Sequence, residues 1–514
     1  MTQEFDVVCL GGGVAGEAIA EGLRESGMTL AVVERELVGG ECPYWGCVPS
    51  KTLLRSGETL SEADRARLLA ASRVEWTVDF PKVSTRVLWM ARNLDDSRPA
   101  AALEATGARL FRGEGKLDGL RTVIVGREQL NARRAVVIAT GSTATIPPIP
   151  GLDTVDFWTN RQAAIPRELP ASLAILGGGA IGVELGQAFA RLGSKVIVIE
   201  AGPRFLSFED PEAGAALRPH LEADGITLTI GDPCVAVEKQ SDGPSHQGSA
   251  VVLHLKSGTV VSADRLLVAT GRRPNVEAWR AAGLAQTERG WLKVDPATLE
   301  AQPGVFGAGD VTGLGGFTHL AHYHGRVIAQ RLRGMDVTAD HAAVPRVTYT
   351  DPEVASVGLS EAAARASGID VVVATAESQR DGARLHPRLP RRCAEAGCRP
   401  RPRSAGRRDP GHSTCGRDRG RARARDQVAN ATEGARRHHS SLPGLQPRAW
   451  RKPRRARHES GFATRGAILI HPSPDTEVTM STQTITEHAI QNRTAAAVDL
   501  KLEVVVIPVA DVGP

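Results

Sequence analysis

The sequence predicts an α/β protein with two doubly wound parallel sheets. The main observation is a repeated pattern, in which an apolar strand, a glycine-rich turn, an amphipathic helix and a strand ending in glutamate follow one another. This pattern begins near residue 5 and again near residue 173. A second observation is that its first strands are short uninterrupted apolar runs, which is typical of parallel strands buried on both faces. The 514 residues are enough for about three or four domains.

The first unit has an apolar run at 5–10, a glycine turn at 11–16, a helical pattern to about Ser26 and a strand ending at Glu34. Glycines in such a turn let a pyrophosphate approach the backbone at the helix N-terminus. The acid about 20 residues further on accepts a hydrogen bond from a ribose hydroxyl. The pattern therefore predicts a dinucleotide site, whose candidate residues are Gly11, Gly13, Gly16 and Glu34.

The second unit repeats this order, with an apolar run at 173–176, a glycine turn at 177–182, a helix to about Leu192 and a strand ending at Glu200. Two complete fingerprints predict two bound dinucleotides. A carboxylate at position 200 accepts from a free 2′-hydroxyl and repels a 2′-phosphate. The candidate residues of this second site are Gly177, Gly179, Gly182 and Glu200.

After the first unit, the stretch 39–51 holds Cys42 and Cys47, five positions apart. In a regular α-helix this separation means a rise of about 7.5 Å and a rotation of about 140°, which no disulfide can bridge. Pro43 and Gly46 let the backbone leave helical geometry between the two thiols. Cys47 then lies near the positive end of the following helix, where a thiolate is favoured and a disulfide is exchangeable.

This stretch, Gly-Gly-Glu-Cys-Pro-Tyr-Trp-Gly-Cys-Val-Pro-Ser-Lys, resembles the redox-active disulfide motif of the flavin-dependent pyridine-nucleotide disulfide oxidoreductases. That family includes dihydrolipoamide dehydrogenase, glutathione reductase and mercuric reductase. The stretch departs from the usual motif at Glu41, where threonine is common, and at Pro43, Tyr44 and Trp45. The resemblance implies FAD on the first fingerprint and NAD on the second, and Glu200 favours NADH over NADPH.

The resemblance also implies the roles of individual residues. Cys47 lies nearer the flavin ring, Cys42 exchanges with the substrate, and Lys51 pairs with Glu184 beside the flavin. The Ala-Thr-Gly signature at 139–141 and a second signature at 305–310 belong to the FAD site. The residues assigned in this way are Gly40, Lys51, Thr140, Gly141, Gly309 and Asp310 for FAD, and Gly271 for NAD.

The resemblance predicts an order of domains along the chain. Residues 1–148 are the first part of the FAD-binding domain, 149–271 the NAD(P)H-binding domain, 272–338 the second part of the FAD-binding domain, and 339–376 a truncated α+β interface domain. A proline-rich connection at 147–150 marks the first boundary. Within the interface domain we expect strands in 344–358, a helix at 361–367 and a strand at 369–374, and the resemblance ends at about Thr375.

From about residue 377 the composition changes. Between Arg380 and Arg465 there are 24 Lys and Arg against 7 Asp and Glu, a local charge of +17, so the rest of the chain carries −12. Such a segment cannot bury enough apolar surface to offset its ordering entropy. It is either a disordered basic tail that binds nucleic acid or the product of a shifted reading frame, which we favour. Residues 377–479 form this segment, and 480–514 resemble the unrelated start of another protein.

A shifted frame removes two features of the family. The interface domain of the family carries a His–Glu pair that serves the substrate-side thiol across a homodimer, and the nearest match, at 471–477, has the wrong spacing. We therefore expect dimerisation and turnover to be impaired. Cys393, Cys398 and Cys415 have poor spacing for a metal site, and no metal is expected.

The chain has no apolar run near the roughly 20 residues of a membrane span, and we expect no signal peptide because a strand pattern begins near residue 5. Seven scattered cysteines fit a reducing cytoplasm. Three functions are consistent with the sequence. The first is an FAD-dependent NAD(P)H:disulfide oxidoreductase that passes electrons to a disulfide, metal-ion or quinone substrate. The second is a dithiol-independent NAD(P)H oxidase or quinone reductase. The third is an inactive product with a nucleic-acid-binding basic tail.

Overall fold

The computed structural model describes residues 1–69, 71–239 and 251–375. The arginine-rich segment 377–479, the segment 480–514 and the cysteines after residue 390 lie outside these residues, and so do the sequence predictions made for them.

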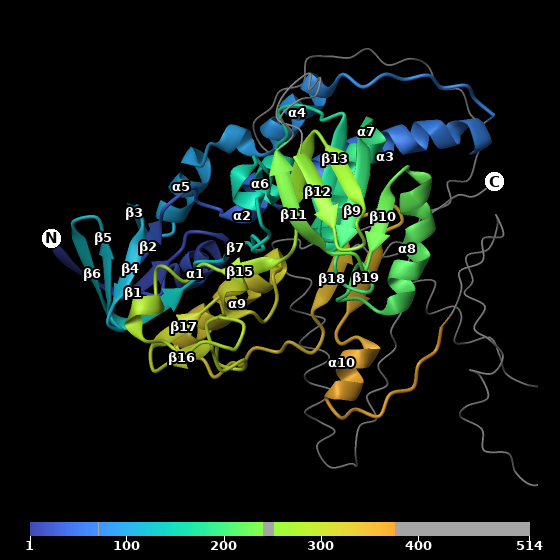
Figure 1. The fold of residues 1–514 in the computed structure, drawn as a ribbon. Coiled ribbons are helices and arrows are strands. Elements are labelled where there is room, and N and C mark those ends of the chain that lie inside the picture. The colour runs from blue at the N-terminus through green and yellow to red at the C-terminus, as the bar shows by residue number, and fades with distance from the viewer. Residues whose placement is uncertain (70, 240–250, 376–514) are drawn as a thin grey trace, which may run out of the picture. The chain divides into compact units, whose positions relative to one another are not determined.

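The first sheet is mostly parallel and is drawn in blue, teal and yellow in Figure 1. Its strand order is β16-β17-β6-β1-β2-β3, and Val7 of β1 lies opposite Leu30 on one side and Ala135 on the other. Strands β4 and β5 form an antiparallel extension of this sheet, whereas β3 continues its parallel part. The strands are β1 (Thr2–Leu10), β2 (Leu30–Glu34), β3 (Arg109–Arg112), β4 (Gly115–Asp118), β5 (Thr122–Val125), β6 (Glu128–Ile138), β16 (Glu300–Gln302) and β17 (Val305–Gly307).

Helices α1 (Val14–Leu23) and α9 (Thr318–Leu332) cover one face of this sheet. The two helices approach closely, because a Cβ atom on Gly325 would lie 2.6 Å from the Ala15 carbonyl oxygen. Buried Ile19 and Ile328 fill the space between the helices and the strands. The opposite face is covered by β4, β5 and the segment around the buried Trp279. This packing fixes the N-termini of both helices at the same end of the sheet as the carboxyl ends of β1 and β17.

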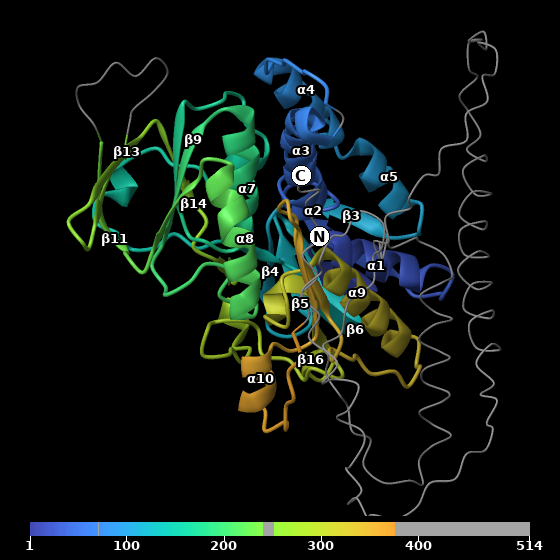
Figure 2. The same ribbon diagram turned by 90° about the vertical axis from the view of Figure 1, so that its right-hand side faces the viewer.

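The second sheet is parallel, with the order β10-β9-β8-β14. Its register pairs Leu173 with Val196 and with Arg265. Helix α7 packs between this sheet and α3, and an antiparallel sheet of β11, β12 and β13 lies on the other face (Figure 2). The elements are α6 (Asn160–Ala164), β8 (Ser172–Leu176), α7 (Ala180–Leu192), β9 (Lys195–Glu200), α8 (Pro211–Ala223), β10 (Thr227–Ile230), β11 (Cys234–Lys239), β12 (Val251–Leu255), β13 (Val260–Ala263) and β14 (Arg265–Val268).

The chain passes twice between the two sheets, near the predicted boundaries at 148 and 271. At these points β7 (Ser142–Ala144) pairs antiparallel with β15 (Arg272–Pro274). Short 3-10 turns complete the described segments, namely η1 (Arg92–Leu94), η2 (Leu152–Thr154), η3 (Arg280–Ala282) and η4 (Gly309–Thr312).

The dithiol stretch forms two helices with a break between them. Helix α2 (Glu41–Tyr44) ends before Gly46, and α3 (Cys47–Leu69) begins directly after it. A Cβ atom on Gly46 would lie 3.2 Å from the Glu41 carbonyl oxygen and 3.3 Å from the Cys42 Cα atom. Glycine therefore lets the break fold back tightly enough to bring the two cysteines together. Helices α4 (Phe80–Met90) and α5 (Ser97–Glu104) follow.

The part of the interface domain that the structure describes is a hairpin and a short helix. Strands β18 (Pro345–Thr348) and β19 (Val354–Val357) pair antiparallel, and α10 (Glu361–Ala366) begins at Ser360, whose hydroxyl caps it. The predicted strand at 369–374 is wrong, since these residues have no regular secondary structure. Their β-branched side chains favour a strand, but a strand also needs a neighbour for its backbone hydrogen bonds. No helix in the described residues is long and apolar enough to cross a membrane.

Candidate active site

Cys42 and Cys47 lie together at the start of α3. Both are free cysteines, and each lies close enough to shift the pKa of the other. The Cys47 sulfur is also 3.4 Å from the hydroxyl of Thr318, the first residue of α9. Cys47 is exposed and Cys42 is half-buried. The break between α2 and α3 thus brings the two thiols close together, as the sequence of the stretch 39–51 predicts.

The two thiols differ in acidity. The hydrogen bond from Cys42 lowers the pKa of Cys47 to about 6, and Thr318 and the Lys51 charge act in the same direction against the cost of burial. The same hydrogen bond, together with burial, raises the pKa of Cys42. Cys47 also occupies the first position of a long helix, whose N-terminus favours negative charge. The pair therefore holds one thiolate, on Cys47, and one thiol, on Cys42, at neutral pH.

Lys51 lies one turn along α3 and pairs with Glu184 of α7. The Lys51 Nζ atom is 2.6 Å from Glu184 Oε2, and only 6% of the Glu184 side chain is exposed. The other oxygen, Oε1, accepts a hydrogen bond from the Tyr349 backbone N–H at 2.9 Å. The Lys51 ammonium lies 4.7 Å from the centre of the Tyr349 ring. The structure thus brings together the four residues that the sequence analysis named as catalytic.

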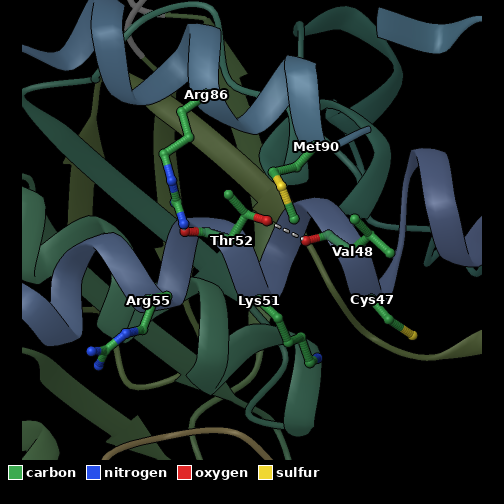
Figure 3. A pocket seen from close by; sticks show the side chains of 7 residues that line it. All are labelled: Cys47, Val48, Lys51, Thr52, Arg55, Arg86 and Met90. Atoms are coloured by element: carbon green, nitrogen blue, oxygen red, sulfur yellow. Dashed lines mark hydrogen bonds between the residues drawn. The ribbon is translucent and has the colours of Figure 1, made fainter. Parts of the chain in front are cut away.

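An open pocket of about 400 Å³ lies beside Cys47 along α3 and α4 (Figure 3). Its lining is cationic at one end, since Lys51, Arg55 and Arg86 contribute to it, and apolar at Met90. Arg86 is fixed by donating to the Thr52 carbonyl oxygen at 3.0 Å. The pocket therefore gives access to Cys47.

The first glycine turn fits a pyrophosphate. A Cβ atom on Gly11 would lie 2.2 Å from the Ala139 carbonyl oxygen, and one on Gly16 would lie 2.3 Å from the Gly11 carbonyl oxygen, so both positions need glycine. Gly13 precedes α1 without any side-chain cap, and it lies against the Cα atom of Gly40. Because glycine has no side chain, this N-cap leaves the first N–H groups of α1 available to an anion.

Glu34 at the end of β2 is oriented by the same turn. Its Oε2 atom accepts from the Gly12 N–H at 2.7 Å, and its Oε1 atom accepts from the Glu36 N–H at 2.7 Å. Burial raises the pKa of this carboxyl, and the two backbone hydrogen bonds oppose the rise. The residues present thus fit the adenosine and pyrophosphate half of a dinucleotide.

The second turn repeats this geometry closely. A Cβ atom on Gly177 would lie 2.4 Å from the Ala269 carbonyl oxygen, and one on Gly182 would lie 2.0 Å from the Gly177 carbonyl oxygen. Gly179 precedes α7 without a side-chain cap, and a Cβ atom there would meet nothing within 4 Å. Glu200 accepts from the N–H groups of Gly178 at 2.7 Å and Gly202 at 2.6 Å. Gly271 follows β14 with φ +130°, in the region that favours glycine.

The remaining predicted FAD residues surround the crossing between the two sheets. Thr140 donates to the Asn275 carbonyl oxygen at 2.8 Å, and Gly141 adopts φ +67°. Gly309 adopts φ +74° and begins η4, which carries Asp310. The Asp310 carboxylate accepts from the Ser142 hydroxyl at 2.6 Å.

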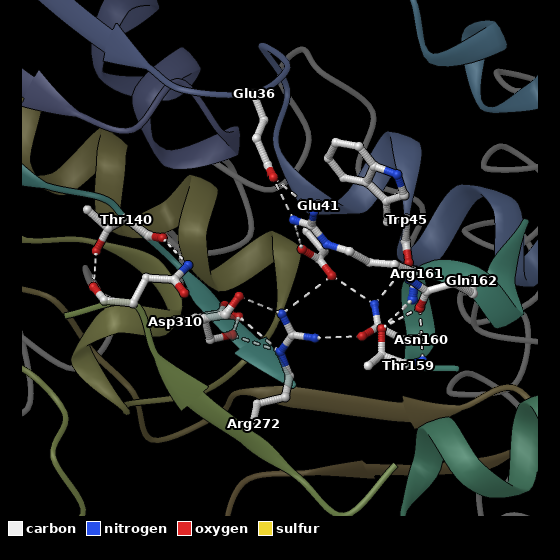
Figure 4. A network of polar contacts seen from close by, with 12 residues as sticks. Glu36, Glu41, Trp45, Thr140, Thr159, Asn160, Arg161, Gln162, Arg272 and Asp310 are labelled. Carbon is white, nitrogen blue, oxygen red and sulfur yellow. Dashed lines mark hydrogen bonds and ion pairs between the residues drawn. The ribbon is translucent and has the colours of Figure 1, made fainter. Parts of the chain in front are cut away.

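A polar network joins the dithiol stretch to the second sheet (Figure 4). Glu41, which replaces the usual threonine, accepts from Asn160 at 2.8 Å and from Arg161 at 3.3 Å, and it lies 3.6 Å from Arg272. Arg161 also binds both oxygens of Glu36, at 3.0 and 2.8 Å. The extra negative charge of Glu41 is therefore matched by two guanidinium groups and an amide.

Trp45 is held by the same pair of residues. Asn160 donates to the Trp45 carbonyl oxygen at 3.1 Å, and the Arg161 guanidinium lies 4.3 Å from the Trp45 ring centre. Two of the four departures from the family motif, at positions 41 and 45, thus contact the first turn of α6.

Two of the histidines of helix α9, His322 and His324, do not contact the dithiol. His322 is exposed. His324 is buried, accepts from the Gly309 N–H at 3.1 Å, and lies 2.9 Å from His341 between ring nitrogens. Burial, together with the His341 charge, lowers the pKa of His324 to about 4. Within the described residues no group of three or more His, Cys, Asp or Glu side chains could hold a metal ion.

Sequence reasoning missed several residues that contact the site. They come from elements far along the chain, and none belongs to a pattern of fixed spacing. One usable signal was the second FAD signature at 305–310, because α9 follows it and begins at Thr318. The missed residues are Asn160, Arg161, Arg272, Thr318 and Tyr349.

Comparison with known proteins places this geometry in a family. Residues 5–325 match the pyridine nucleotide-disulphide oxidoreductase family, and residues 344–388 match the dimerisation domain of that family. The second match runs past Thr375, where the sequence analysis placed the end of the resemblance.

Two curated relatives are a mercuric reductase of Staphylococcus aureus and a dihydrolipoyl dehydrogenase of Chlorobaculum tepidum. The first is 31% identical over 72% of this chain and 67% of its own length. The second is 32% identical over 74% of this chain and 82% of its own length. A mercuric reductase of Bacillus cereus is 33% identical, and the match covers 72% of this chain but 58% of that protein.

A solved structure, the Cu(II) complex of the HOCl-induced flavoprotein disulfide reductase RclA from Escherichia coli, aligns with a TM-score of 0.62 at 27% identity. The alignment covers 72% of this chain and 81% of that one. FAD and a pyridine nucleotide are the cofactors of this family, and both glycine turns described above fit them. The chain therefore belongs to the FAD-dependent pyridine nucleotide-disulphide oxidoreductases.

Proposed function

We propose that this chain oxidises NADH and reduces the Cys42–Cys47 disulfide, and that the resulting dithiol reduces a small disulfide or a thiophilic metal ion. The observation that carries this proposal is the contact of the two thiols at the start of α3, beside the Lys51–Glu184 pair and Thr318. A merely structural pair of cysteines has no need of a neighbouring ammonium or of a helix N-terminus.

FAD, when bound, supplies a two-electron connection between a nicotinamide and the dithiol. The first turn and Glu34 would hold its adenosine and pyrophosphate, and Asp310 its ribityl hydroxyls. The same site would also be lined by the backbone of three glycines and by one short side chain, namely Gly40, Gly141, Gly309 and Thr140. Lys51, fixed by Glu184, would present a positive charge to the flavin.

The preference for NADH is supported by two neighbouring side chains. Glu200 directs a carboxylate to the place where a ribose 2′-hydroxyl binds in such folds. Arg204, four positions after Glu200, is a cation that could otherwise pair with a 2′-phosphate. It donates instead to the carbonyl oxygens of its own loop, at Leu206, Ser207 and Glu209.

The dithiol would act by thiol–disulfide exchange. Cys42 attacks a substrate disulfide, and its proton passes to the hydrogen-bonded Cys47 thiolate. The Cys42 sulfur then bonds to one substrate sulfur, and the other substrate sulfur leaves as the first thiolate. That leaving thiolate takes the proton, which restores the Cys47 thiolate. Cys47 then attacks the Cys42 sulfur, the mixed disulfide breaks, and a second substrate thiolate leaves. The Cys42–Cys47 disulfide is restored.

The relatives named mercuric reductase bear on the substrate class. A pair of cysteines with one stable thiolate is a suitable ligand set for a thiophilic metal ion. We propose a metal ion as the alternative substrate of the same dithiol. The match to a dimerisation domain supports a homodimer through the hairpin of β18 and β19, with turnover limited by the missing His–Glu pair.

The test is an anaerobic titration of the FAD-loaded full-length chain with NADH. Free thiols at positions 42 and 47 are counted by mass spectrometry after alkylation. We expect one equivalent of NADH to convert the oxidised pair into two thiols. A Cys47→Ser variant cannot form the disulfide, so NADH should release no additional thiol from it. Oxidation of NADH that leaves the disulfide intact would contradict the proposal and favour a dithiol-independent oxidase or quinone reductase.

A further inference from the structure

The hairpin of β18 and β19 reaches the dithiol site of its own chain. The Tyr349 N–H, just after β18, donates to Glu184 Oε1 at 2.9 Å, while Lys51 binds Oε2 of the same carboxylate at 2.6 Å. The Tyr349 ring also lies beside the Lys51 ammonium, 4.7 Å from its nitrogen. The remnant of the interface domain therefore contacts both members of the ion pair.

We propose that Tyr349 is a positioning residue that holds the Lys51 ammonium between its ring and the Glu184 carboxylate, and so keeps that charge directed at Cys47. The proposal adds a residue to the proposed function and rests on Cys47 acting as the thiolate of the dithiol.

The energetics favour an ordered lysine. A lysine that only one carboxylate holds keeps several rotamers, because its four-carbon stem is flexible. A ring on the opposite side removes these alternatives, and the attraction of a cation to an aromatic face adds to the effect when the cation is partly desolvated. One third of the Lys51 side chain is exposed, so the charge is not fixed by burial alone.

Other contacts anchor the hairpin against α7 and α3. Gln187 accepts from the Asp351 N–H at 2.7 Å and donates to the Asp351 carbonyl oxygen at 2.9 Å. Asp351 also pairs with Arg191 at 2.9 Å and with Arg65. Tyr349 thus belongs to a segment that α7 binds through both Gln187 and Arg191. Its ring therefore has a defined place relative to Lys51.

The charged and titratable groups around Cys47 come from four elements. Cys42 belongs to α2, Lys51 to α3, Glu184 to α7, and Tyr349 to the hairpin. Glu353, in the turn of the same hairpin, acts on Tyr349 and lies further out. Arg55 and Arg86 also line the pocket beside Cys47, but the cation that lowers the pKa of Cys47 is Lys51, so the position of Lys51 affects how much of the thiolate charge is compensated.

The test compares Tyr349→Phe with Tyr349→Leu in the reduced full-length chain. Iodoacetamide labelling of Cys47 is followed against pH, and the labelled position is identified by peptide mass. Phenylalanine keeps the ring, and we expect the wild-type profile. Leucine removes the ring but leaves the backbone N–H, and we expect labelling at pH 6.5 to slow by about two- to fivefold, as the loss of a modest cation–π contact implies.

The control is Trp89→Leu, which removes a more exposed ring from α4 outside the pocket lining and should leave the profile unchanged. Tyr349→Met replaces Tyr349→Leu if leucine impairs folding. A wild-type profile in the leucine and methionine variants would overturn the proposal, and so would an equal shift in the phenylalanine variant, which would assign the effect to the phenol hydroxyl. Labelling does not require turnover, so failure of the proposed function would be seen separately as absence of NADH-driven thiol formation.

Discussion

Lys51 Nζ lies 2.6 Å from Glu184 Oε2, although 133 positions separate the two residues in the chain. The contact joins α3, which begins at Cys47, to α7, which begins at the second glycine turn. One ion pair thus connects the helix that bears the Cys47 thiolate with the helix that would bind the nicotinamide dinucleotide. Its carboxylate is almost completely buried, so the pair cannot be replaced by water without cost.

Replacing Glu184 with glutamine tests this connection. The variant keeps an acceptor for the Tyr349 N–H but leaves the Lys51 ammonium without a carboxylate. We expect the free energy of unfolding to fall by about 1–3 kcal/mol, less than for a fully buried pair because Lys51 is partly exposed. Urea denaturation measures this change. The matched control is Arg133→Gln, which breaks an exposed pair with Asp6 and should cost about 0–1 kcal/mol. Equal effects of the two variants would contradict the importance of the buried pair.

The acidity of Cys47 should depend on Cys42. Because the hydrogen bond from Cys42 stabilises the Cys47 thiolate, labelling of Cys47 in the reduced chain should follow a midpoint at about pH 6. A Cys42→Ala variant removes the donor, so the pKa of Cys47 should rise and labelling at pH 7 should slow. Thr318→Val should shift the profile in the same direction by less. Cys9 is an internal control, because burial raises its pKa to about 12 and it should stay unlabelled throughout.

Sequence patterns identified the parts of this site that depend on local spacing. The two glycine turns and the acids at 34 and 200 follow from fixed intervals, since each set lies on one strand–turn–helix–strand unit. The two cysteines follow from their spacing around the break between α2 and α3. The pairing of Lys51 with Glu184 came from family resemblance alone, because two helices far apart in the chain must pack before it forms. Thr318 and Tyr349 reach the dithiol only through tertiary packing, and no interval in the sequence indicates either.

The predicted strand at 369–374 failed for a related reason. Its valines favour extended backbone, but a strand also requires a partner edge, and neither β18 nor β19 pairs with it. The prolines at 147–150 lie in the first crossing between the sheets, after β7 and before β8. The pairing of β7 with β15 across that crossing was not predicted, because both strands are only three residues long.

The preference between NADH and NADPH should depend on Glu200. We expect Glu200→Gln to raise the KM for NADH by about tenfold or more, because a hydrogen bond to a charged group contributes about 1.5–3 kcal/mol. The ratio of kcat/KM values for the two nucleotides should fall, since the repulsion of a 2′-phosphate is also lost. Glu34→Gln is the matched control in the first turn, where it should weaken FAD retention and leave the ratio unchanged. A wild-type preference for NADPH would contradict the assignment.

The glycines that precede α1 and α7 should differ from the sterically required glycines of the turns in how alanine at each position affects folding and nucleotide binding. Alanine at 179 meets nothing within 4 Å, so Gly179→Ala should fold normally yet weaken NADH binding by covering the helix N-terminus. Gly182→Ala would place a Cβ atom 2.0 Å from the Gly177 carbonyl oxygen, so it should lower the thermal midpoint as well. Calorimetric titration with NADH and thermal melting measure the two effects. Unchanged NADH binding by Gly179→Ala would contradict this site.

The network around Glu41 allows a test by charge exchange. Asn160 donates to the Glu41 carboxylate at 2.8 Å, so Asn160→Asp places a second carboxylate against the first. We expect a loss of about 1–3 kcal/mol in the free energy of unfolding, from like charges and from the donor lost to the Trp45 carbonyl oxygen.

Adding Glu41→Gln should recover part of this loss, because the new amide can donate to the aspartate. The double variant should therefore be more stable than the sum of the single changes predicts, by about 0.5–3 kcal/mol. Urea denaturation of the four chains gives this coupling energy directly. A coupling near zero would mean that Asn160 and Glu41 act independently, and that the departure from threonine at position 41 is not compensated through α6.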